Sequence, residues 1–231
     1  MKTVFILVEP AVAGNIGSAA RAIKVMGFRE LWLVNPTNHL AEEAQWLAHA
    51  SGEILENARI FNTLQEAAAE TDLLVATSAK NRSTHQDFIK GATLKAFAEK
   101  KQPLINTLGI VFGREESGLT SSEMLLCDVA TSVPMATTYP SLNLSQAVML
   151  YAFLMQTTPE EQEHEIKQDN APGFRRMKNN IMEIIKAAGF SNKHPILQRI
   201  NERLSALSGK DMNLVHSVAM KIKEKYLRDN P

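Results

Sequence analysis

The N-terminal part of the chain reads Thr3-Val-Phe-Ile-Leu-Val8, then five further residues, then Gly14-Asn-Ile-Gly-Ser-Ala-Ala-Arg21. An apolar strand, a loop with glycines and a helix start form a turn that can bind phosphate, because a helix N-terminus presents free N–H groups and a positive dipole end. The dinucleotide fingerprint needs Gly-x-Gly-x-x-Gly tight against the strand and an acidic residue about twenty positions later. Here the spacing is Gly-x-x-Gly, and the next strand ends in Asn35-Pro36, which provides no carboxylate for the ribose. A nicotinamide site is therefore disfavoured, whereas Arg21 near the start of the helix indicates an anionic substrate.

Short aliphatic runs continue along the chain and alternate with amphipathic or Ala-rich segments. The predicted strands lie near residues 3–8, 31–34, 72–77, 107–112 and 128–133, with a weaker one near 59–61. Such alternation predicts an α/β fold, with a mostly parallel sheet and helices on both faces. Ligands of these folds bind beyond the carboxyl ends of the strands.

The C-terminal third has a different composition. A predicted helix at 143–156 is followed by the polar, acidic segment 157–172 and then by helical patterns at 174–188, 195–207 and 211–228, the second of them ended by Gly209. The sequence therefore predicts a domain at 1–156, a linker at 157–172 and a helical appendage at 173–231.

Charge is divided unevenly between these parts, although the net charge is zero. Residues 1–169 hold 13 Lys and Arg against 20 Asp and Glu, and residues 170–231 hold 12 against 5. This asymmetry is consistent with a polyanion-binding appendage and equally with a solvated helical face.

Composition excludes several classes of protein. Apolar residues make up 45% of the chain, which is ample for a buried core, and no apolar run approaches the roughly twenty residues of a membrane helix. No signal-like N-terminus is evident, so we expect a cytoplasmic protein without membrane contact. The single cysteine, Cys127, is expected to be inert packing at the start of a buried strand, and the six histidines show no metal-ligand spacing, so no metal is expected.

Three strand-end loops have unusual compositions: Thr77–Arg82, Gly113–Leu119 and Pro134–Leu144. The first loop follows an apolar strand and contains small hydroxyl residues and two cations. The second loop has charged residues between two glycines, where the backbone can approach a ligand closely. Taken singly, each loop is better explained as a turn or a helix cap, with Ser141 as a possible cap.

Along the whole chain, three motifs occur in a fixed order: N-x-G-x-x-x-R at 15–21, F-G-R-E-x-x-G-L at 112–119 and S-L-N-L-x-x-A-V at 141–148. With these motifs the chain resembles the SpoU-type RNA 2′-O-methyltransferases. Within that family it is most similar to the TrmJ-like enzymes that methylate the ribose of the first nucleotide of the tRNA anticodon loop, since it also has Thr77-Ser-Ala79, Arg82 and a helical C-terminal part with Gly189-Phe190 and His194-Pro195.

The resemblance implies an α/β domain whose C-terminal part forms a deep trefoil knot, which periodicity cannot reveal, and a homodimer. It also implies S-adenosylmethionine as cofactor, tRNA as substrate and methylation of a ribose 2′-hydroxyl. The cofactor residues carried over from the family are Thr77, Ser78, Ala79, Gly113, Val133, Pro134, Ser141, Leu142, Asn143 and Leu144.

The resemblance further implies that Arg21 reaches the ribose from the partner subunit. A guanidinium is not a base near neutrality, so we expect Arg21 to stabilise developing negative charge. The other candidate catalytic residues are Asn15, Glu115, Ser141 and Asn143, and the expected RNA contacts are Arg21, Lys80, Arg82, Arg114, Tyr139, Arg175 and Arg176. Some relatives have arginine in place of Lys80, and lysine cannot make the bidentate contact.

Two alternatives remain for the function. The same chemistry on ribosomal RNA differs from the main hypothesis only in its substrate. A non-catalytic RNA-binding protein of the same fold is disfavoured because Arg21, Asn143 and the run at 141–144 are all present.

Overall fold

The computed structural model describes residues 1–79, 88–102, 104–137, 142–156, 173–190 and 195–226. The strands are β1 (Lys2–Val8), β2 (Glu30–Val34), β3 (Arg59–Phe61), β4 (Leu73–Thr77), β5 (Phe88–Lys90), β6 (Thr107–Phe112) and β7 (Val129–Ser132). The helices are α1 (Ala13–Val25), α2 (Glu42–Ala48), η1 (His49–Ser51), α3 (Gly52–Glu56), α4 (Leu64–Ala69), η2 (Gly91–Thr93), α5 (Leu94–Glu99), α6 (Ser121–Leu126), α7 (Leu144–Met155), α9 (Phe174–Ala187), α10 (Pro195–Ala206) and α11 (Gly209–Tyr226).

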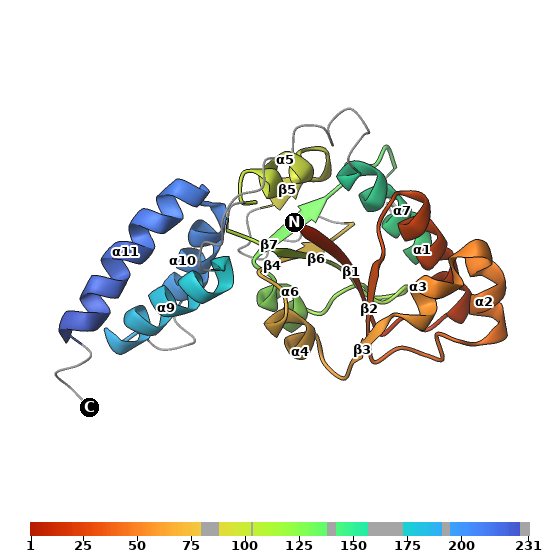
Figure 1. The fold of residues 1–231 in the computed structure, drawn as a ribbon, viewed down its shortest axis with the longest axis horizontal. Helices are drawn as coiled ribbons and strands as arrows, with labels where there is room; N and C mark the ends of the chain where they lie inside the picture. Colours follow the sequence, from red (N-terminus) through yellow and green to blue (C-terminus); the bar gives the residue numbers. More distant parts are fainter. Residues whose placement is uncertain (80–87, 103, 138–141, 157–172, 191–194, 227–231) are drawn as a thin grey trace.

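The strands form one parallel sheet in the order β3-β2-β1-β6-β4-β7-β5 (Figure 1). The α/β fold and its parallel sheet are thus confirmed. The six predicted strands all form, and β5 is an additional edge strand. The last helix was predicted at 211–228, but α11 begins two residues earlier, at Gly209, so this glycine is the first residue of a helix as well as the end of the preceding helical pattern.

Both faces of the sheet are buried, which explains why the strands are nearly continuous apolar runs. Along β1, Phe5 and Leu7 face one core with residues of α1 and α7, whereas Val4, Ile6 and Val8 face the other core with residues of α4 and α6. The sheet therefore lies between two helical layers.

The glycines of the first helix serve helix packing. A Cβ at Gly17 would lie 2.1 Å from the carbonyl oxygen of Ala44 in α2, and one at Gly14 would lie 2.5 Å from the Glu43 carboxylate. α1 and α2 can therefore approach closely only because these two positions lack a side chain. The Gly-x-x-Gly spacing that resembles a phosphate loop is explained by this contact.

We expect Gly17→Ala to destabilise the protein by at least about 3 kcal/mol, because the added methyl group meets backbone that cannot rotate away. Chemical denaturation of the variant measures the loss of unfolding free energy. Gly52→Ala is the matched control, since a Cβ there meets nothing within 4 Å and the backbone is helical, with φ −55°. Equal stability of the two variants would contradict the packing role of Gly17.

The C-terminal helices dock at the edge of the sheet where the strands begin (Figure 1). The backbone N–H of Phe174 donates to the carbonyl of Leu104, just before β6, at 2.8 Å. The Phe174 side chain is fully buried, and the Lys101 ammonium lies 5.0 Å from its ring centroid. Lys101 also donates to the Leu207 carbonyl at 2.7 Å, beyond the end of α10. α9 and α10 are thus packed against the α/β part.

Two cations of α9, Lys178 and Arg175, belong to this contact, and the second of them was expected to bind RNA. Lys178 is 6% exposed and forms an ion pair with the buried Asp128, and Arg175 donates to the Thr71 carbonyl and lies 3.4 Å from the same carboxylate. Burial lowers the pKa of Lys178 to about 8. Arg175 is therefore not retained as an RNA contact, whereas Arg176 is exposed.

Cys127 is buried between α6 and β7, and burial raises the pKa of its thiol to about 12. The thiol is therefore un-ionised at neutral pH, in line with a packing role. Within the described ranges, no helix combines the length and apolar character that crossing a membrane requires. The same residues contain no group of three His, Cys, Asp or Glu side chains arranged to hold a metal ion.

Candidate active site

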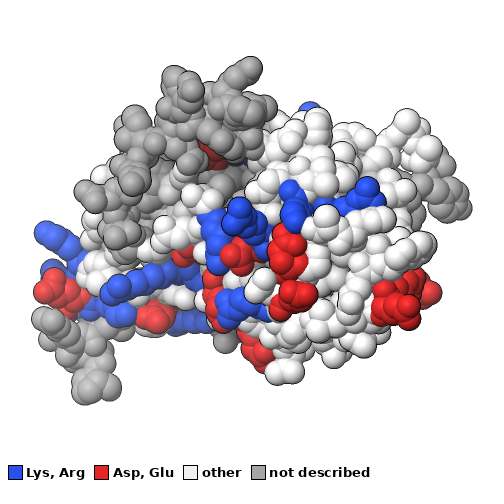
Figure 2. Space-filling view, turned by 45° about the vertical axis from the view of Figure 1, so that its right-hand side comes forward, with Lys and Arg blue, Asp and Glu red and all other residues white. Residues whose placement is uncertain are grey.

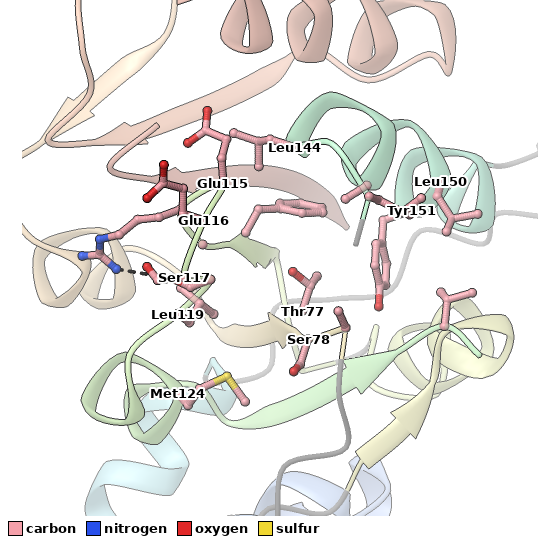
Figure 3. Close-up of a pocket in the computed structure, with 18 of the residues that line it drawn as sticks. Thr77, Ser78, Glu115, Glu116, Ser117, Leu119, Met124, Leu144, Leu150 and Tyr151 are labelled. Atoms are coloured by element: carbon pink, nitrogen blue, oxygen red, sulfur yellow. Dashed lines mark hydrogen bonds between the residues drawn. The ribbon is translucent and has the colours of Figure 1, made fainter. Parts of the chain in front are cut away.

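A cavity of about 350 Å³ opens at the carboxyl ends of β4, β6 and β7 (Figure 3). The carboxyl ends of the strands are where parallel α/β sheets bind ligands. Seven of the expected cofactor residues line it, namely Thr77, Ser78, Ala79, Gly113, Val133, Leu142 and Leu144. The three strand-end loops with unusual compositions therefore meet at one cavity.

Gly113 is required by the backbone on one side of this cavity. A Cβ there would lie 2.1 Å from the carbonyl carbon of Gly118 and 2.2 Å from the nitrogen of Leu119. Arg114 and Gly118 exchange two backbone hydrogen bonds, of 3.2 and 2.9 Å, that close the loop between them. The loop 113–119 is thus a tight turn whose shape depends on glycine.

Next to the cavity, hydrogen bonds join one residue from each of the three motifs. The Asn15 amide nitrogen donates to the Glu115 carboxylate at 3.1 Å, and the Asn143 amide nitrogen donates to the Asn15 oxygen at 2.8 Å. Asn143 also caps the N-terminus of α7, because its side-chain oxygen accepts a hydrogen bond from the backbone N–H of Ser145 at 2.9 Å. The structure therefore brings together three of the five expected catalytic residues, from positions up to 128 residues apart.

Glu115 occupies the N-terminal end of α1 that a nucleotide phosphate would need. Its carboxylate accepts the backbone N–H groups of Ala11 at 3.1 Å and Val12 at 3.3 Å. Burial opposes ionisation of Glu115, but the hydrogen bonds from Asn15 and the two backbone groups outweigh it, so the pKa is lowered. A charged Glu115 thus holds the loop that leads into α1.

Arg114, the neighbouring residue, is held by two other carboxylates. Its Nε donates to Glu9 at 2.8 Å, and its terminal nitrogens donate to both oxygens of Glu123 at 3.0 and 2.9 Å. Hydrogen bonds to Glu123 and Glu9 raise the pKa of Arg114. Because its guanidinium is committed to these partners, Arg114 is not retained as an RNA contact.

Other expected site residues lie apart from the cavity or outside the described residues. Arg21 is exposed on α1 and does not line the cavity, and its side chain makes no hydrogen bond or ion pair with other described residues. Pro134 is exposed and, like Asn143, is not among the lining residues. Four expected residues fall outside the described ranges: Lys80, Arg82, Tyr139 and Ser141.

The cavity also contains residues that sequence reasoning missed, above all Tyr151 of α7. Its side chain packs edge-on against Phe112, with ring centroids 5.7 Å apart, and burial raises the pKa of its hydroxyl to about 12. That hydroxyl makes no hydrogen bond of acceptable geometry within the described ranges, and the hydroxyl of the neighbouring Thr131 donates to Ile89 instead. Only the period of α7, which places Tyr151 on the face of Leu144 and Val148, could have indicated it.

Comparison with known proteins places this geometry in a family. The SpoU rRNA Methylase family matches residues 2–153. LasT of Escherichia coli K12, described as an uncharacterized tRNA/rRNA methyltransferase, is 36% identical over 216 residues, which cover 94% of this chain and 95% of LasT. TrmJ of the same strain, a tRNA (cytidine/uridine-2′-O-)-methyltransferase, is 33% identical over 82% of this chain and 80% of its own length. The crystal structure of TrmJ from Z. mobilis ZM4 shares the fold, with a TM-score of 0.69 and 24% identity over 96% of this chain and 100% of that one.

Proposed function

The chain belongs to the SpoU rRNA Methylase family, and we propose that it transfers the methyl group of S-adenosylmethionine to a ribose 2′-hydroxyl of tRNA. The observation that carries this proposal is the hydrogen-bonded set of Asn15, Glu115 and Asn143 beside a cavity at the carboxyl ends of the strands. All three residues lie in the motifs that define the resemblance.

The cavity fits a cofactor with both polar and apolar parts. Leucine, valine and methionine side chains line one part of it, and the Thr77 and Ser78 loop lines another. Among the residues that the structure describes, the buried Tyr151 hydroxyl has no hydrogen-bond partner, and an unsatisfied buried hydroxyl is costly, so a polar ligand atom or water is expected near it. When bound here, S-adenosylmethionine supplies an electrophilic methyl group on a sulfonium centre.

The residues of the chain then position and polarise the ribose hydroxyl. Arg21 stabilises the charge that develops on the 2′-oxygen or on the adjacent phosphate, because a guanidinium is a cation that can donate several hydrogen bonds. Glu115 already accepts three hydrogen bonds, so it orients Asn15 and the start of α1 rather than accepting the proton. Asn15 and Asn143 lie beside the cavity with their amide groups hydrogen-bonded to each other, and we propose that this pair helps to position the ribose.

The substrate is tRNA, and the methylated ribose is that of the first nucleotide of the anticodon loop. TrmJ of Escherichia coli is a tRNA methyltransferase by name, and LasT carries a name that leaves tRNA and rRNA open. Transfer of a labelled methyl group to purified tRNA and to ribosomal RNA, assayed side by side, separates the two substrates. We expect tRNA alone to be labelled in this assay. In the cell, we propose that the protein acts in the cytoplasm.

We further propose that the chain forms a homodimer and that the C-terminal part of its α/β domain is threaded as a trefoil knot, as in the family. Exposed apolar side chains near the cavity support the dimer: Phe153 of α7 is 56% exposed, Val12 is 43% and Leu142 is 38%. Multi-angle light scattering measures the mass directly. A fully active monomer would contradict both the dimer and the role of Arg21 across its interface.

The helices α9–α11 form the RNA-binding appendage in this proposal. Figure 2 shows Lys and Arg side chains along these helices. Among them, Arg176, Arg199 and Lys221 are exposed. Cutting the chain before α9 would uncover the buried Phe174, so point substitutions are a cleaner test of this role than truncation.

We expect the double variant Arg176→Gln with Lys221→Gln to bind tRNA more weakly and with a shallower dependence on salt. Each lost phosphate contact reduces the slope of log K against log salt by about 0.9 for a duplex. The control variant Lys2→Gln with Arg59→Gln removes the same charge from the α/β part. Binding titrations over a range of salt compare them, and equal slopes for the two variants would rule out the appendage as the RNA-binding element.

A further inference from the structure

Glu9 has a backbone conformation that side chains rarely adopt. It follows the last residue of β1, and its φ of 46° places it in the left-handed region, where only glycine and, less readily, asparagine and aspartate are comfortable. Its N–H donates to the carbonyl of Val34 at 2.8 Å, which continues the pairing of β1 with β2 by one residue. A glutamate in this position is strained, and strain of this kind collects at functional sites.

The side chain of Glu9 explains why glutamate is present there. Its carboxylate accepts from Nε of Arg114 at 2.8 Å, and the hydrogen bond from Arg114 lowers the pKa of Glu9. The opposite edge of the same guanidinium is held in a bidentate contact by Glu123, whose side chain is 15% exposed. Glu123 also forms the capping box of α6 with Thr120. The ion pair therefore ties the end of β1 to a rigid helix terminus.

Glu115, which follows Arg114 in the loop 113–119, also binds the segment between β1 and α1. While Arg114 bonds Glu9, Glu115 accepts from the N–H groups of Ala11 and Val12 and from the Asn15 side chain. Two consecutive side chains of the cavity loop thus hold both ends of the segment 9–15, which runs from the end of β1 into the first turn of α1. That segment carries Asn15 and leads to Arg21.

We propose that Glu9 is a positioning residue for methyl transfer, which fixes the segment 9–15, and with it Asn15, through Arg114. This inference rests on the proposed function. Removing the carboxylate frees one end of the segment, so that Glu115 alone joins the loop 113–119 to it. The cofactor-lining residues Thr77 to Ala79 and Val133 belong to other loops and keep their places.

The test uses the full-length protein and the variant Glu9→Gly. Glycine adopts a φ of 46° without strain, so this variant should be at least as stable as the wild type while it lacks the carboxylate. We expect kcat for tRNA methylation to fall at least about tenfold, because small displacements of positioned groups are costly in rate. The dissociation constant of S-adenosylmethionine and the KM for tRNA should stay within about threefold.

A purely structural role for Glu9 predicts the opposite pattern, with no loss of kcat once stability is preserved. Glu9→Gln keeps the strain and the size but loses the charge, and it should lose kcat as Glu9→Gly does. His49→Gly is the matched control, since His49 has a similar φ of 49° and lies far from the cavity loop in the chain. It should gain stability and keep kcat.

A double-mutant cycle identifies the partner through which Glu9 acts. If Glu9 works through Arg114, the loss of kcat in Glu9→Gln with Arg114→Lys should be clearly smaller than the product of the two single losses. Independent, multiplicative losses would overturn the proposal, as would kcat within twofold of wild type in Glu9→Gly, or a loss that appears only in cofactor binding.

Amide hydrogen exchange keeps this inference separate from the proposed function. A wild-type protein that transfers no methyl group to tRNA would refute the proposed function. The positioning role would then be judged by the exchange of residues 11–16, which should be faster in Glu9→Gly than in the wild type and unchanged in His49→Gly. Unaltered exchange in Glu9→Gly would refute the positioning role itself.

Discussion

Arg21→Ala lowers the rate of methyl transfer by about 10²–10³-fold or more while S-adenosylmethionine binds within a few-fold of its wild-type affinity. The rate falls because a preorganised cationic donor at a developing oxyanion contributes about 3–4 kcal/mol to the transition state. Cofactor affinity is preserved because Arg21 is exposed on α1 and does not line the cavity. Steady-state kinetics and calorimetric titration of the same preparation measure the two effects.

Lys24→Ala is the control for this variant. Lys24 is the next cation of α1 and forms an ion pair with Glu53, away from the cavity. Its removal should leave kcat within about twofold, because an exposed ion pair contributes little. Near-normal turnover by Arg21→Ala, or an equal loss in both variants, would refute the role that we assign to Arg21.

Gly113→Ala is expected to weaken S-adenosylmethionine binding by at least about 100-fold, which corresponds to about 2.7 kcal/mol. The new methyl group would lie about 2.1 Å from backbone atoms of Gly118, so the turn that forms one wall of the cavity must open. Calorimetric titration gives the affinity, and circular dichroism checks that the sheet remains folded. Gly52→Ala serves again as the control, and wild-type affinity in Gly113→Ala would show that the turn does not shape the cofactor site.

Combining the two variants tests whether Arg21 acts across a dimer interface. A heterodimer with Arg21→Ala in one subunit and Gly113→Ala in the other has one cavity that can bind cofactor and one intact Arg21, on different chains. If Arg21 serves the partner's cavity, this heterodimer recovers up to about half of the wild-type activity, because one of two symmetric sites is complete. If it serves its own cavity, the heterodimer is inactive.

The sequence predicted the sheet well because strands buried on both faces are apolar throughout, as in Phe5 to Val8. It missed β5, because the three residues Phe88–Lys90 are too few to show a strand pattern. It located the three motif loops but not their hydrogen bonds, since Asn15, Glu115 and Asn143 meet only through the tertiary fold.

Charge was the feature least predictable from the sequence. The sequence shows how many cations the C-terminal helices contain. It does not show that two of them, Lys178 and Arg175, pair with Asp128 where the strands begin. Likewise, Arg114 looks like an RNA contact in sequence, whereas Glu9 and Glu123 occupy its guanidinium. The strain at Glu9 depends on a backbone angle that a glutamate in a sequence does not reveal.

The most direct test of the proposed reaction is to locate the methyl group on its product. tRNA purified from a strain lacking this protein is incubated with the protein and labelled S-adenosylmethionine, digested with nucleases, and analysed by mass spectrometry of the fragments and nucleosides. We predict that the methyl group lies on the ribose of the first nucleotide of the anticodon loop, and that Arg21→Ala produces far less of this product in the same time. A methyl group on a nucleobase, or no transfer to tRNA by the wild-type protein, would contradict the proposed function.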